Sequence, residues 1–218
     1  MNKLVPALAA IVVLYTGLSG AANAQFSMKS LQSVTNVVSP GSTGGSAAQD
    51  PDAMVRQYVA ANKDVLNANA LMAQALGLKD AAATAKATAD ALTEGATKDN
   101  LNASDKEISA STDAVAAALA KKPVLDEQSK ALYGKGLISL ASGMTRYVGV
   151  GKAVKDVGGS LHTVNPMAMG KMQSAVYVVS NFPQSFSTVS AALKNTVSFA
   201  QGSDIPVPAD ASQALAAL

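Results

Sequence analysis

The chain has no cysteine and no tryptophan, and only 4% of its 218 residues are aromatic. Without cysteine it can form neither a disulfide nor a lipid-modified cysteine, so its stability must come from the packing of its core. The low aromatic content is unfavourable for a β-sandwich, because sheets favour β-branched and aromatic residues. Abundant alanine instead favours helices that pack closely through small side chains. The sequence therefore predicts an all-α fold.

Residues with catalytic or metal-binding chemistry are scarce as well. General acid-base catalysis usually depends on histidine or paired carboxylates, and zinc sites favour cysteine and histidine. The chain has one histidine, His162, which follows Ser160 in a predicted loop without the G-x-S-x-G pattern of a nucleophile elbow. We therefore predict no catalytic residue, no metal and no cofactor. An enzyme with a dispersed site that includes His162 is one alternative.

The charge of the chain is small, and its distribution is uneven. A formal net charge of +2 is far from the strongly basic composition of a nucleic-acid-binding protein, so we expect no nucleic-acid partner. Between residues 131 and 200, however, six basic residues accompany a single acid, Asp156. This excess predicts at most a mild attraction to anionic surfaces, such as a peripheral membrane contact.

Residues 1–24 have the order of a cleaved signal peptide. Lys3 gives a short positive region, residues 4–18 form an apolar core, and Ala22-Asn23-Ala24 fits the signal peptidase site. The apolar core is too short for an ordinary membrane-spanning helix. We therefore expect cleavage between Ala24 and Gln25 and export to the periplasm or the extracellular space.

The rest of the chain divides into three parts by composition. Residues 25–49 are rich in serine and glycine and predict a flexible linker. Residues 50–202 carry apolar residues at spacings of three and four, which predicts a single bundle of about six helices. Residues 203–218 contain two prolines and predict an extended tail that ends in at most one turn of helix.

Local signals set the expected helix boundaries. Asp50-Pro51 is a typical helix start, and Ser104-x-x-Glu107 has the form of a capping box, which predicts a loop before residue 104. Pro183 predicts a break between two helices, the second capped by Asn181, because proline is poorly tolerated inside a helix. The expected helices cover residues 51–76, 78–93, 104–122, 124–157, 165–181 and 182–201.

The helix expected over residues 124–157 has the strongest pattern, and we expect the other helices to pack against it. A stripe of small residues, Gly136, Ser139 and Gly143, runs beside its apolar face. Glycine in a helix interior costs roughly 1 kcal/mol relative to alanine, so this repetition predicts the close approach of another backbone. The neighbour is a helix of the same chain, or else a partner or membrane helix.

Methionines extend this apolar surface. Met167, Met169 and Met172 lie close together in the sequence, and methionine suits irregular apolar ligands as well as gaps in a core. The candidate ligand-binding or partner-binding residues are Tyr133, Gly136, Gly143, Met144, Tyr147, Met169 and Met172.

The sequence favours an exported, non-enzymatic helical bundle that binds an envelope protein or an apolar small molecule between its helices. A second possibility is a membrane-active or lipid-binding protein that uses residues 124–157, and the enzyme with His162 is the third.

Overall fold

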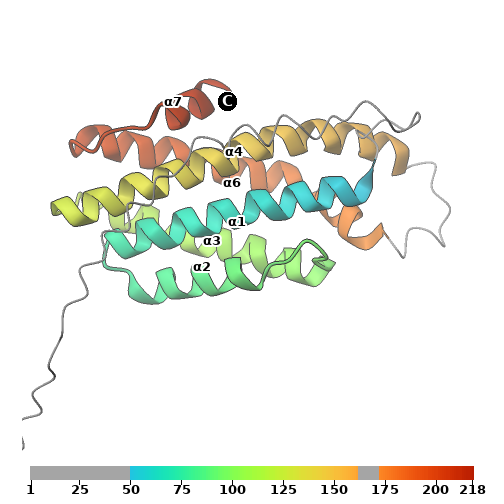
Figure 1. Ribbon diagram of the computed structural model, residues 1–218, viewed down its shortest axis with the longest axis horizontal. Helices are drawn as coiled ribbons and strands as arrows, with labels where there is room; N and C mark the ends of the chain where they lie inside the picture. Colours follow the sequence, from blue (N-terminus) through green and yellow to red (C-terminus); the bar gives the residue numbers. More distant parts are fainter. Residues whose placement is uncertain (1–49, 162–171) are drawn as a thin grey trace, which may run out of the picture. The chain divides into compact units, whose positions relative to one another are not determined.

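The computed structural model describes residues 50–161 and 172–218, all within the unit Gly45–Leu218. These residues form six helices and no strand, which confirms the predicted all-α bundle (Figure 1). The signal cleavage site at Ala24 and Gln25, the linker, His162, Met167 and Met169 lie outside the described residues. The helices are α1 (Pro51–Ala75), α2 (Lys79–Ala91), α3 (Lys98–Leu119), α4 (Glu127–Leu161), α6 (Gln173–Gly202) and α7 (Ala209–Ala216).

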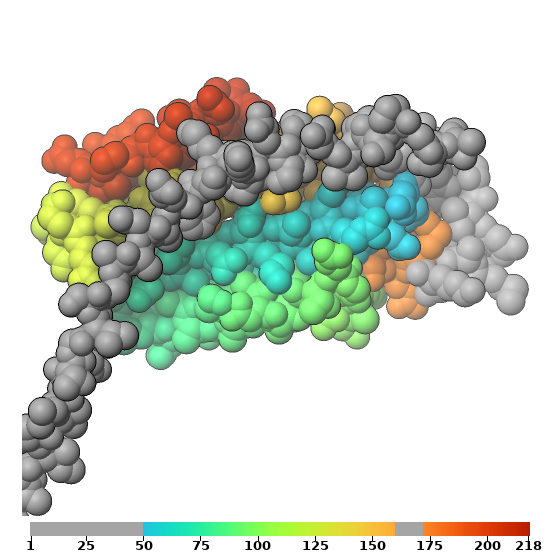
Figure 2. Space-filling model, in the orientation of Figure 1, coloured from blue at the N-terminus to red at the C-terminus, as the bar shows by residue number. Residues whose placement is uncertain are grey.

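The helix α1 is the centre of the bundle. The side chain of Asp50 accepts a hydrogen bond from the amide of Asp52 (2.9 Å), and Pro51 occupies the first helical position, as the sequence predicts. The helix packs against α2, α3, α4 and α6, and α1 and α2 lie side by side in the space-filling view (Figure 2). The extensive contacts of α4 are with α1, α6 and α7. The expectation that the other helices pack against α4 is therefore wrong, because α2 and α3 pack against α1.

The start of α3 differs from the expected one. The structure places the capping box at Thr97 and Asn100, where the Thr97 hydroxyl accepts from the Asn100 amide (3.3 Å) and the Asn100 side chain accepts from the Thr97 amide (3.0 Å). Ser104 lies fully buried inside α3 and accepts a hydrogen bond from Asn62 (3.0 Å). Because α3 already begins at Lys98, the predicted loop before residue 104 is wrong. The real capping box has asparagine where glutamate is usual, so it is harder to recognise in the sequence.

The break predicted at Pro183 is also wrong, because α6 continues through this residue as one helix (Figure 1). Asn181 does not cap a helix; its side-chain amide donates to the carbonyl of Tyr177 (2.9 Å), one turn earlier. An interior proline costs about 3 kcal/mol, so packing must offset it. Buried residues on both sides of Pro183, including Val178 and Val189, provide that packing.

The helix α4 begins and ends slightly later than expected, at Glu127 and Leu161. The carboxylate of Asp126 accepts a hydrogen bond from the amide of Ser129 (2.7 Å), which supports a start after Pro123 and Val124. Four later glycines, at positions 149, 151, 158 and 159, do not end the helix.

The C-terminal tail contains more helix than the single turn that the sequence predicts. After a non-helical stretch, residues 209–216 form the eight-residue helix α7, whose Ala211 and Ala214 are buried. This helix packs mainly against α4, and Ile205 in the preceding stretch is also buried. The end of the chain therefore adds to the core of the bundle.

The small-residue stripe on α4 marks its contact with α1, as the sequence predicts. A Cβ atom at Gly136 would lie 2.7 Å from Cγ of Met72 and 3.1 Å from the carbonyl oxygen of Ala68. A Cβ atom at Gly143 would lie 2.8 Å from Cγ2 of Val65 and close to the backbone of α1. Both distances are shorter than an ordinary van der Waals contact, so the packing needs glycine at these two positions. The close approach occurs within the monomer.

This packing predicts opposite effects of one substitution at two glycines of α4. Gly143→Ala should fail to stabilise the protein, and Gly143→Leu should lower the free energy of unfolding by about 1–3 kcal/mol through overpacking. Gly149→Ala is the matched control, because a Cβ atom at Gly149 would have no neighbour within 4 Å. This substitution should stabilise by roughly 1 kcal/mol, since alanine is the better helix former. Urea denaturation measures all three, and equal stabilisation by both alanine variants would contradict the tight contact.

Candidate functional site

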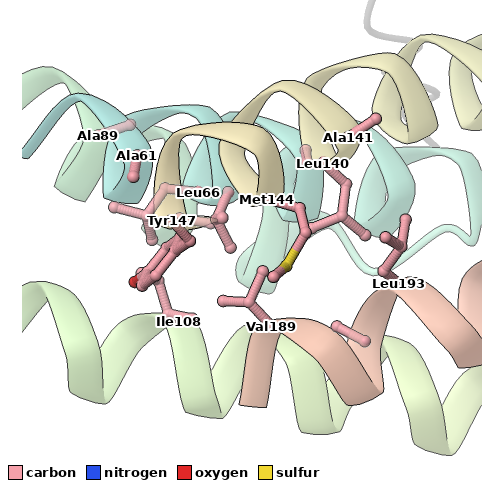
Figure 3. Packing of buried hydrophobic residues seen from close by; sticks show 14 of the residues in the cluster. Ala61, Leu66, Ala89, Ile108, Leu140, Ala141, Met144, Tyr147, Val189 and Leu193 are labelled. Carbon is pink, nitrogen blue, oxygen red and sulfur yellow. The ribbon is translucent and has the colours of Figure 1, made fainter. Parts of the chain in front are cut away.

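The structure places the predicted site residues mostly in the core. The side chains of Tyr133, Met144 and Tyr147 are completely buried. Figure 3 shows Met144 pointing from α4 toward Val189 of α6. Met172 is half-buried just before α6. These residues are therefore in contact with the protein itself, and ligand binding at them stays a prediction.

The two tyrosines of α4 use their hydroxyl groups inside the bundle. The Tyr133 hydroxyl donates to the carbonyl of Thr196 (3.1 Å). The Tyr147 hydroxyl donates to the side-chain oxygen of Asn62 (2.5 Å), and its ring stacks on Phe182 with a centroid distance of 6.0 Å. These contacts fix α4 against α1 and α6 and explain why both tyrosines are buried.

A cluster of hydrogen-bonded polar side chains crosses the core near Tyr147 and Asn62, and we call it the Asp105 cluster. It consists of Tyr58 and Asn62 of α1, Asp105 of α3, Tyr147 of α4, and Tyr177 and Ser185 of α6. The Asp105 carboxylate accepts hydrogen bonds from Tyr58 (2.7 Å), Tyr177 (2.8 Å) and Asn62 (2.8 Å). Four helices thus meet through one set of polar groups.

The surroundings of Asp105 determine its protonation. Burial raises the pKa of its carboxyl group above the usual 3.8, although the hydrogen bonds from Tyr58, Tyr177 and Asn62 lower it in part. Burial also raises the pKa of Tyr58, Tyr147 and Tyr177. The tyrosine hydroxyls therefore keep their protons and act as hydrogen-bond donors rather than as bases or nucleophiles.

A polar groove lies beside this cluster, between α3 and α6, and the first of its two hollows has a volume of about 450 Å³. Asp105, Tyr177 and Ser185 belong to both the cluster and the groove. The remaining lining is mainly polar and includes Asn102, Lys106, Ser109, Asp113, Gln184 and Thr188. A second hollow of about 460 Å³, lined by Lys98, Gln173, Val176 and Ser180, shares Tyr177 and Asn181 with the first. The two hollows thus adjoin along α6.

A second groove lies where α3 and α6 end, and we call it the terminal groove. Its volume is about 820 Å³. Its large apolar lining residues are Leu119, Val124, Leu125 and Phe199, and its polar lining residues are Lys122, Lys130, Asn195, Ser198, Ser203 and Asp204. Val124 is 99% exposed, although it is a large apolar residue.

Within residues 50–161 and 172–218, no group of three or more histidine, cysteine, aspartate or glutamate side chains is placed to hold a metal ion. In the same ranges, no helix is long and apolar enough to cross a membrane.

Apart from Tyr147, the residues of the Asp105 cluster were missed by sequence reasoning. Tyr58 fits the apolar face of α1, and Asp105 fits the false capping box before Glu107, so neither stands out. The available signal is Asn62 and Asn69, which recur among the apolar residues on the inner face of α1. Buried asparagines need hydrogen-bond partners, and Asn69 finds them in Ser111 (2.8 Å) and Thr112 (3.0 Å) of α3.

The raised pKa of Asp105 predicts how stability depends on pH. The unfolded chain releases this proton at a lower pH than the folded protein does, so ionisation of Asp105 lowers the stability of the fold as pH rises. The free energy of unfolding of wild type minus that of Asp105→Asn should therefore decrease as pH rises from about 4, the ordinary pKa of aspartate. Tyr177→Phe removes one donor to the carboxylate and should make the decrease larger. Urea denaturation between acidic and neutral pH measures this difference, and an increase with pH would contradict the assignment.

No family model matches this chain, and neither a curated protein nor a solved structure matches it.

Proposed function

We propose that this protein is an exported, non-enzymatic binding protein whose terminal groove holds an apolar segment of another envelope protein. The observation that carries the proposal is the exposure of Val124, at 99%, beside Leu125 and Phe199 of the groove. Single exposed apolar residues are common, but one at the edge of a large groove with further apolar side chains is typical of a contact site. Residues that fill such pockets usually provide most of the binding energy.

The form of the groove favours a protein segment over a small molecule. A volume of about 820 Å³ would accept either kind of ligand. A small molecule inside the groove would leave the outer side of Val124 in water, however, whereas a chain lying across the groove would cover it. A protein segment thus accounts for both the hollow and the exposed residue.

The charges around the groove indicate the chemistry of that segment. Lys122 and Lys130 line the groove, and Asp204 is the one acid among the lining residues. Lys130 also pairs with Glu127 (3.3 Å), whose side chain is 91% exposed, so solvent screens this pair. The best partner is therefore a segment with an apolar side chain flanked by carboxylates, which would complement the lysines.

The Asp105 cluster supports a binding function over an enzymatic one. Its carboxylate already accepts three hydrogen bonds, and its tyrosines hold their protons because burial raises their pKa values. Three of the roughly four acceptor sites of the carboxylate are thus used by donors of the fold itself, which leaves little capacity to accept a substrate proton. The cluster is better suited to hold the helices together than to move protons.

The alternative of a membrane-active protein loses its main support. That hypothesis depends on a glycine stripe open to lipid, and Gly136 and Gly143 are instead covered by Met72 and Val65 of α1. Exposure of the stripe to lipid would require α1 and α4 to separate and would expose the core.

Export rests on residues 1–24 and has its own test. Intact-mass analysis of the protein from outside the cytoplasm should give a chain that begins at Gln25, because the Ala-x-Ala site lies directly before it. A mature product that keeps Met1 would rule out cleavage, and recovery only from the cytoplasm would rule out export.

Photo-crosslinking tests the partner proposal in the organism that makes the protein. A photoreactive phenylalanine analogue at Val124 should give one crosslinked envelope protein. The same analogue at Ala87, an exposed residue of α2, is the control and should not give that product. Lys122→Glu combined with Lys130→Glu should weaken the crosslink, since both lysines would then repel an acidic segment. Equal crosslinking from both positions, or no product from Val124, would contradict the proposal.

A further inference from the structure

The polar groove is formed by two facing stripes of hydrogen-bonding side chains. On α6 the stripe contains Gln173, Tyr177, Asn181, Gln184 and Thr188, which recur at spacings of three and four and therefore share one face of the helix. On α3 it contains Lys98, Asn102, Asp105, Ser109 and Asp113, with the same kind of spacing. Two facing helices usually meet through apolar residues, so a polar hollow between them indicates room for a polar ligand.

The groove is long enough for an extended ligand. The two adjoining hollows share Tyr177 and Asn181, and their lining runs on α6 from Gln173 to Thr188. The fifteen steps between these two residues, at about 1.5 Å each, correspond to about 22 Å along the helix axis. A ligand that follows the whole groove is therefore a short chain rather than a single small ring.

The side chains of the lining define the chemistry of this ligand. Asparagine, glutamine, serine and threonine both donate and accept hydrogen bonds, and hydroxyl groups of a ligand do the same. The charged residues of the lining all lie on α3 and are of both signs, Lys98 and Lys106 with Asp105 and Asp113, so neither a polyanion nor a polycation is favoured. Val176 and Ile108 are among the few apolar residues of the lining, which disfavours a peptide that would need apolar anchors.

Residues of the Asp105 cluster line the floor of the groove, and hydrogen bonds hold their side chains in place. The Tyr177 side chain is only 9% exposed and is held by its hydrogen bond to Asp105 (2.8 Å), which is itself held by Tyr58 and Asn62. Ser185 lies 2.8 Å from the Tyr58 hydroxyl on the same floor. A floor with fixed side chains loses little conformational entropy when a ligand binds.

We propose that the groove between α3 and α6 binds an oligosaccharide, a chain of polyhydroxylated rings that lies along α6. This site involves different residues from the terminal groove, so it does not depend on the proposed protein partner.

The test is titration of the ¹⁵N-labelled mature chain with three uncharged hexasaccharides, one of glucose, one of mannose and one of N-acetylglucosamine. At least one should shift the amide signals of Asn102, Tyr177 and Gln184 in a saturable manner. Gln184→Ala and Asn102→Ala should each weaken that binding about fivefold, the loss expected for one hydrogen bond. Gln74→Ala, which removes another exposed glutamine, from α1, is the matched control and should leave the affinity unchanged.

Two outcomes would overturn the proposal. One is the absence of saturable shifts in the groove with all three hexasaccharides at millimolar concentration. The other is a shift of the same signals by a Ser-Gly hexapeptide or by spermidine but not by a hexasaccharide, which would assign the groove to a peptide or to a polyamine.

Discussion

The close contact between α1 and α4 is the constraint on which the rest of the structure depends. Gly136 and Gly143 are seven residues apart, and so are Met72 and Val65, the side chains that cover them. Gly136 meets Met72 and Gly143 meets Val65, so the residue numbers rise along α4 as they fall along α1. The two helices are therefore antiparallel, and the same contact repeats after about two turns. At the edge of this contact, Asp64 of α1 links the two helices because it accepts hydrogen bonds from Ser142 (2.8 Å) and Arg146 (2.9 Å) of α4. The glycines thus define both the distance and the register of the two helices.

That register brings the polar core together. With α4 close to α1, the Tyr147 hydroxyl reaches Asn62, whose amide group reaches Asp105 of α3. In a core of low dielectric constant, each of these groups would be costly without its partners, and the hydrogen bonds strengthen one another. Among the described residues, every buried side-chain nitrogen or oxygen has a hydrogen-bond partner. The cluster therefore favours this one arrangement of four helices over alternatives in which apolar faces slide past each other.

The sequence predicts the parts of this structure that depend on periodicity. The start of α1 follows from its capping residues, and the extent of α4 follows from apolar residues three and four positions apart. The glycine stripe predicts the tight contact between helices. Features that depend on a partner elsewhere in the chain are not predictable in this way. Ser104 resembles a helix cap in the sequence, and only the structure shows that it is buried and bonded to Asn62. Pro183 likewise resembles a helix break, and only the structure shows the packing on both sides of it. Among residues 50–161 and 172–218, the number of helices agrees with the prediction only because α6 replaces two expected helices and α7 adds one in the tail.

The continuity of α6 through Pro183 also bears on function, because this one helix lines both grooves. Its first half carries Gln173, Tyr177 and Gln184 of the polar groove, and its last turns carry Asn195 and Phe199 of the terminal groove. Had the chain broken at Pro183, the two surfaces would belong to separate helices that could move independently. A site on a rigid helix keeps its side chains in place more accurately than a site on a loop. One helix does not by itself couple two sites, because coupling requires an element with two alternative arrangements. The Asp105 cluster joins α6 to α1 and α3 through hydrogen bonds of Ser185 and Tyr177, so we expect the two proposed sites to act independently.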